Sequence, residues 1–190
     1  MGDFNRESFY QFFIRHCAPT MASLKCSNMM SCPDDPSYRE DLAKISEELE
    51  EKGVKVRIIS LSKNRMLIFV YRPNMLAKRF VEEDVRHFLA GYGYEDFEVE
   101  ATLDRLQLRI PKDLQNFPHE IGVFLGYPLA DIISFIENNG KNGLMVGEWK
   151  VYHEPEAATK MFAKFQKCRD VYNQLFSNGA RTMYQLTVAA

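Results

Sequence analysis

The stretch VKVRIISLSKNRMLIFVY, residues Val54–Tyr71, carries the strongest secondary-structure signal in the chain. In its first part every second residue is apolar, at Val54, Val56 and Ile58, which is the period of a half-buried strand. After a turn at residues 62–64, six consecutive apolar residues follow, which indicates a strand covered on both faces. The stretch therefore predicts a β-hairpin over residues 54–72.

Helical spacing of apolar residues predicts about seven helices around this hairpin. A capping box at Ser37 and Glu40 is expected to start one of them, and Pro19 is expected to restart the chain after the first, with a short helix at 20–26. A third strand is predicted at 144–152. The main predicted helices cover residues 5–16, 37–53, 75–90, 103–110, 118–125, 128–138 and 155–176.

This pattern predicts an α+β fold, in which a small antiparallel sheet of about three strands (hairpin 54–72 plus strand 144–152) is covered by helices. A chain of 190 residues is long enough for one domain with its own core and short for two, so we expect a single domain over 1–190. Residues 27–36, SNMMSCPDDP, are predicted to form a loop. That loop leaves one alternative, in which residues 1–32 form a helical N-terminal arm.

Composition excludes the collagen-like, disordered and disulfide-scaffold classes. The 24 basic and 26 acidic side chains nearly cancel, which argues against nucleic-acid binding driven by bulk charge. Within this balance, residues 54–72 carry five basic and no acidic residues, while residues 37–53 and 74–100 are acidic. We expect the basic hairpin to be compensated by the acidic segments beside it.

The chain shows no signal peptide at its N-terminus and no apolar run near the roughly 18 residues that span a bilayer. Its four cysteines, Cys17, Cys26, Cys32 and Cys168, include no C-x-x-C pair. We therefore expect reduced thiols, a cytoplasmic protein and no contact with a membrane.

The first candidate for chemistry is HCAPT, His16–Thr20. If Pro19 opens a helix, Cys17 lies just before the N-terminus of that helix, where free N–H groups and the helix dipole stabilise a thiolate. His16 could assist as a neighbouring base. In the alternative interpretation, His16 and Cys17 are ordinary members of the core.

The second candidate is FPHE, in which His119 and Glu120 would occupy the first turn of the helix at 118–125. His119 could be a general base or a metal ligand, and a Cys17–His119 dyad oriented by Glu120 is chemically sensible. In the alternative interpretation, His119 and Glu120 simply begin a capped, buried helix and have no chemical role. The H-E-x-x-H zinc pattern is not met, and no metal site is predicted.

The third candidate is Trp149, the single tryptophan, in the strand GEWKVYH. Alternation places Trp149 and Val151 on one face of that strand and Glu148 on the other. Trp149 could line a ligand pocket or cap the core of the sheet. Lys25 follows the first candidate segment closely and could contact an anion.

Three blocks together resemble a bacterial family of uncharacterised proteins known mainly from anaerobic Gram-positive bacteria. They are His16–Thr20 with Lys25, FPHEIGVFLGYPLADIISFI (Phe117–Ile136), and GEWKVY (Gly147–Tyr152), which leads to a helix with Cys168. The resemblance covers nearly the whole chain, so it implies one full-length domain in a bacterial cytoplasm. It implies no activity.

The sequence thus favours a domain that binds a small molecule or a protein partner, with His16, Thr20, Lys25 and Trp149 as ligand-binding residues. The alternative is a hydrolase or transferase that uses Cys17, His119 and Glu120. A further alternative is a metal- or haem-linked redox protein that uses His16, Cys17, His119 or Cys168. The sequence assigns no cofactor and no oligomeric state.

Overall fold

The predicted hairpin is the centre of the structure. The computed structural model describes residues 8–62, 64–111 and 116–189. Strands β2 (Lys55–Ser62) and β3 (Arg65–Tyr71) pair antiparallel, as expected, although Lys63 of the predicted turn lies outside the described residues. A third strand, β1 (Ser27–Pro33), pairs antiparallel with the other edge of β3, so the strand order is β1-β3-β2.

The prediction of a loop at residues 27–36 was wrong, and so was the identity of the third strand. Serine, asparagine and proline favour turns, and the segment has no β-branched residue, so its local propensity hides the strand. Pairing with β3 overrides that propensity. The segment predicted as the third strand forms a separate two-stranded sheet of β4 (Met145–Val146) and β5 (Lys150–Val151).

The central strand β3 is buried on both faces, which confirms the interpretation of its continuous apolar run. Met66 and Val70 face one hydrophobic cluster, whereas Leu67 and Phe69 face a second cluster on the other side of the sheet. The period of two in a strand sends alternate side chains to opposite faces, and here each face meets helices. The α+β class is therefore observed.

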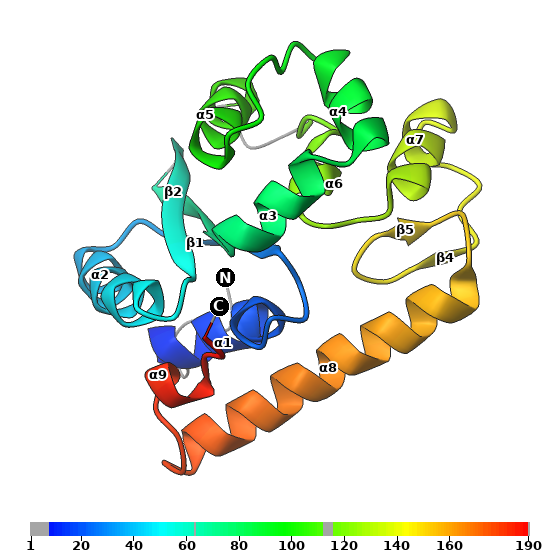
Figure 1. Ribbon diagram of the computed structural model, residues 1–190. Helices are drawn as coiled ribbons and strands as arrows, with labels where there is room; N and C mark the ends of the chain where they lie inside the picture. The colour runs from blue at the N-terminus through cyan, green and yellow to red at the C-terminus, as the bar shows by residue number, and fades with distance from the viewer. Residues whose placement is uncertain (1–7, 63, 112–115, 190) are drawn as a thin grey trace.

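Four helices cover the face of Met66 and Val70. The longest of them packs along the first, and both cross below the sheet in Figure 1. These helices are α1 (Phe9–Met21), α2 (Pro36–Glu50), α8 (Pro155–Ser177) and α9 (Met183–Leu186).

Two expected helix boundaries on this face are corrected. Helix α1 does not stop before Pro19 but runs through it, and residues 20–26 form no separate helix. Pro19 has no N–H group to donate within the helix, and α1 ends two residues later, at Met21. Helix α2 is capped by Asp35, whose side chain accepts from the Ser37 amide at 2.8 Å, and not by a capping box at Ser37.

The other face of the sheet carries the middle of the chain (Figure 1). The helix predicted at 75–90 is two helices, because the chain turns at Val81, which is 67% exposed rather than buried. The turn lets both pieces pack on the same cluster. The elements of this half are α3 (Pro73–Phe80), α4 (Glu83–Ala90), α5 (Val99–Arg109), α6 (Ile121–Phe124) and α7 (Leu129–Glu137).

From residue 8 onward, the N-terminal part packs into the body of the fold. Phe13 and Ile14 of α1 are fully buried in the cluster beneath the sheet, and β1 is itself a strand of that sheet. Among the described residues, no helix is both long and apolar enough to cross a membrane.

Candidate functional site

Cys17 lies in a setting opposite to the one expected from the sequence. Since α1 continues through Pro19, Cys17 is near the C-terminal end of a helix, where the dipole disfavours a thiolate. Its side chain is buried and donates to Met30 Sδ at 3.7 Å. Burial raises the pKa of the Cys17 thiol, against the smaller opposing effect of the positive charge on Lys25.

The structure does not bring His119 and Glu120 to Cys17. Cys17 packs in the cluster under one face of the sheet, whereas Glu120 and α6 belong to the other face. The Glu120 carboxylate is buried and accepts hydrogen bonds from Arg109 Nε and from the Tyr94 hydroxyl. His119 precedes α6, is exposed, and sets its ring edge-on to Phe135, with 5.5 Å between the ring centroids.

Two other predicted residues, His16 and Lys25, do meet, in a cavity of about 410 Å³ between α1, β1, α8 and the β4–β5 turn. Thr20 is not among the residues that line this cavity. Its hydroxyl donates to Oδ1 of Asn28, which does line it, at 2.7 Å. We name this space the basic cavity; the side chains that define it are Arg15, His16, Lys25, Asn28, Tyr127, Glu148 and Arg169.

In the basic cavity, the Glu148 carboxylate lies close to two basic side chains, Arg169 and Lys25. Arg169 Nη2 bonds both oxygens of Glu148, at 2.7 and 2.8 Å. Lys25 Nζ is 3.9 Å from Glu148 Oε2, beyond hydrogen-bond distance. Burial lowers the pKa of Lys25, and the negative charge of Glu148 opposes that shift.

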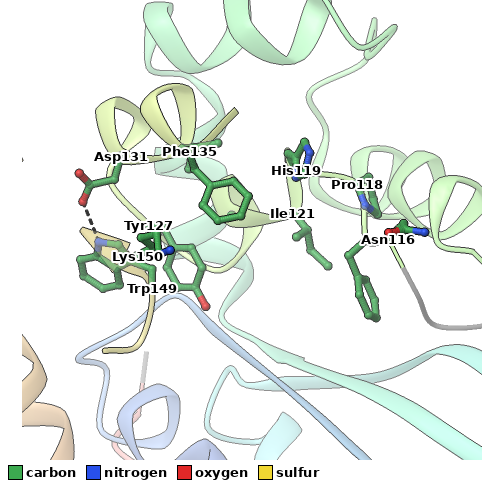
Figure 2. A pocket seen from close by; sticks show the side chains of 12 residues that line it. Asn116, Pro118, His119, Ile121, Tyr127, Asp131, Phe135, Trp149 and Lys150 are labelled. Carbon is green, nitrogen blue, oxygen red and sulfur yellow. Dashed lines mark hydrogen bonds between the residues drawn. The ribbon is translucent and has the colours of Figure 1, made fainter. Parts of the chain in front are cut away.

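Trp149 lines a second, apolar cavity of about 400 Å³. Figure 2 shows Trp149, Lys150 and Tyr127 on one side of it, the segment from Asn116 to Ile121 on the other, and the Phe135 ring pointing between them. We name this space the aromatic cavity; the side chains that define it are Phe117, His119, Ile121, Tyr127, Phe135 and Trp149.

Asp131 holds the Trp149 wall in place. This buried carboxylate in the first turn of α7 accepts from Trp149 Nε1 at 2.7 Å, drawn dashed in Figure 2, and from the amides of Tyr152 and His153 at 2.9 Å. A satisfied network of this kind fixes the orientation of the indole. Nothing in the local sequence pattern singled out Asp131.

Tyr127 is the wall that both cavities share. Its ring centroid is 5.2 Å from that of Trp149, and Lys25 Nζ lies 5.4 Å from it as well. Burial, followed by the negative charge of Glu148, raises the pKa of Tyr127 to about 12, so its hydroxyl stays protonated. Glu148 and Trp149, adjacent in sequence, line different cavities, although they lie between β4 and β5 and not in a strand as predicted.

The sequence missed several residues of these cavities, chiefly Tyr127, Arg169 and Asn28. Each comes from an element that meets the others only in the folded chain, so no local spacing connects them. Within the described ranges, no three His, Cys, Asp or Glu side chains gather where they could hold a metal ion.

Comparison with known proteins bears on the family and not on these cavities. No curated protein and no solved structure matches the chain. A model of one family, described as "Protein of unknown function (DUF3793)", matches residues 13–187, nearly the whole length. The expected resemblance to a family of uncharacterised proteins is thereby confirmed, and the chain belongs to the family DUF3793.

Proposed function

We propose that this protein binds a small molecule whose apolar part occupies the aromatic cavity. The observation that carries the proposal is a preformed cavity of about 400 Å³ whose indole wall is locked by Asp131. Ligand sites typically combine such a volume with apolar, aromatic walls and a few placed polar groups. His119, the Asp131 carboxylate and Lys150 supply the polar groups here.

A cytoplasmic location belongs to the same proposal. All four cysteines are free and buried in the structure. Free thiols persist most readily in a reducing compartment.

The single tryptophan reports directly on the proposed site. We expect the neutral probe phenylbutyramide to shift Trp149 emission and to raise the melting temperature of the purified protein. Binding to the native state alone stabilises that state by mass action. Absence of both effects at millimolar probe would overturn the proposal.

A matched pair of variants on α7 locates the binding. Phe135 faces the cavity, whereas Ile133 on the same helix is exposed. We expect Phe135→Ala to weaken phenylbutyramide binding about tenfold, because a lost aromatic contact of about 1.4 kcal/mol corresponds to that factor. Ile133→Ala should leave the affinity unchanged. Equal affinities of the two variants would place the probe elsewhere.

A further inference from the structure

We propose that the basic cavity binds an oxyanion, carboxylate or phosphate, and that the ligand is an acid whose apolar body reaches the aromatic cavity. The oxyanion site stands on its own geometry, while the link to an apolar body rests on the proposed function. The ammonium group of Lys25 is its central contact.

The buried ammonium group of Lys25 has hydrogen-bond donors that an anion could accept. Its side chain is only 6% exposed, yet in the part of the chain that the structure describes its Nζ makes no hydrogen bond. An ammonium group carries three N–H donors, and a buried charge is unfavourable unless it is paired and hydrogen-bonded. An oxyanion in the basic cavity would accept these donors.

Charge in the basic cavity also favours an anion. Among the described residues that line it, Arg15, Lys25 and Arg169 are basic and Glu148 is acidic. The Glu148 carboxylate is already bonded through both oxygens to Arg169, so it compensates Lys25 only at a distance. Attraction between charges strengthens where water is displaced, so a bound anion gains most at this buried position.

Asn28 adds a neutral donor. Because the Thr20 hydroxyl donates to Asn28 Oδ1, the amide nitrogen of Asn28 is left to donate, and no described residue accepts from it. Lys25 and Asn28 thus contribute donors from the α1–β1 connection and from β1 itself. A compact ammonium suits carboxylate and phosphate alike, so the shared chemistry is that of an oxyanion.

Tyr127 borders both the oxyanion site and the aromatic cavity. Lys25 and Trp149 each lie near its ring, at 5.4 and 5.2 Å from its centroid. In the proposed complex, the ligand passes this ring and places its acid group beside Lys25 and its apolar body beside Trp149. This geometry predicts a preference for acids over their neutral amides.

The test compares phenylbutyrate with phenylbutyramide by calorimetry on the full chain. We expect the acid to bind at least tenfold more tightly than the amide. Lys25→Met should abolish this preference while leaving amide affinity within twofold, and Lys164→Met, an exposed lysine of α8, should preserve it. Phenylpropylphosphonate replaces phenylbutyrate to distinguish phosphate from carboxylate as the preferred group.

A second variant keeps the test decisive if Lys25→Met fails to fold. Glu148→Gln removes the negative charge that the described residues place in the basic cavity, and it is expected to tighten phenylbutyrate binding several-fold, with amide affinity unchanged. Unchanged or weaker acid binding in this variant would count against the oxyanion site.

The two proposals fail in different ways. If the amide binds and the acid binds no more tightly, the oxyanion site is wrong and the proposed function stands. If neither probe binds, the proposed function is wrong, and inorganic phosphate then tests the basic cavity alone. Phosphate stabilisation of the wild type that is lost in Lys25→Met supports the oxyanion site, and no stabilisation overturns it.

Discussion

Among single residues, Arg72 is a buried charged side chain whose contacts join distant segments of the chain. Its guanidinium donates to the carbonyl oxygens of Thr20, Met21 and Val188, at 2.6, 2.7 and 2.7 Å. The first two carbonyls belong to the last turn of α1, where the dipole is negative, and each also accepts a backbone N–H, from Ser23 and from Val188. One side chain at the end of β3 thereby joins the first helix and the C-terminal segment to the sheet.

We expect Arg72→Met to lower the free energy of unfolding by about 2–4 kcal/mol, because three buried carbonyls lose a charged donor. Urea denaturation followed by circular dichroism measures the loss. Arg39→Met is the control, since Arg39 pairs with Asp34 at the surface, where an ion pair contributes less than about 1 kcal/mol. Equal losses in both variants would show that the Arg72 contacts do not matter.

Secondary-structure elements could be predicted where their own side chains determine them. The predictions of the hairpin and of the long helix from Pro155 were confirmed. In both segments the apolar residues recur along the chain with the period of a strand, two, or of a helix, 3.6. Strand β1 was missed because its residues have low strand propensity and its pairing with β3 is not visible in its own sequence. The break at Val81 was missed because the apolar spacing continues across it.

The Asp131 carboxylate joins α7 to the segment around β5 through three hydrogen bonds. In Asp131→Asn, one carboxylate oxygen becomes an amide group that faces the Trp149 N–H, so two donors oppose each other. We expect a loss of about 1–3 kcal/mol in stability and a red shift of Trp149 emission as the indole becomes more exposed. Unfolding curves and emission spectra measure both.

Glu137→Gln is the matched control for this prediction, because Glu137 is exposed at the other end of α7. It should change neither stability nor emission. An Asp131→Asn protein with wild-type emission would show that the hydrogen bond does not position the indole.

Across the whole molecule, the four thiols are buried in both clusters that flank the sheet: Cys17, Cys32 and Cys168 in one, Cys26 in the other. Burial raises the pKa of all four, to about 11 for Cys32 and Cys168. An unfolded thiol has a pKa of about 8.5. Above that pH the unfolded chain loses protons that the folded chain retains, so stability falls as pH rises.

We expect the free energy of unfolding to decrease between pH 8.5 and 9.5 by about 1 kcal/mol for each buried thiol, and the thiols to contribute no pH dependence below about pH 7.5. Urea titrations at a series of pH values measure this decrease. In Cys168→Ala, the free energy of unfolding should decrease by about 1 kcal/mol less than in the wild type, because one buried thiol is absent. Identical slopes in variant and wild type would contradict the burial-based shift.

At the scale of the molecule, the candidate site could be predicted from the sequence only in part. The sequence singled out Lys25, His16 and Trp149 from their chemistry and local setting, and the structure places each of them at a cavity. It also grouped Cys17 with His119, which lie toward opposite faces of the sheet. Neighbouring residues carry no information on which side of the sheet a distant segment will pack.

The sequence by itself determined the fold class, the central hairpin, most helices and the family, because periodicity and motif blocks are local properties of the chain. Only the tertiary structure decided that β1 completes the sheet, that Cys17 lies near the end of a helix rather than before its start, and that Tyr127 separates two adjoining cavities. These features depend on long-range packing. Burial and pairing free energies arise only when segments far apart in sequence meet, so no local pattern encodes them.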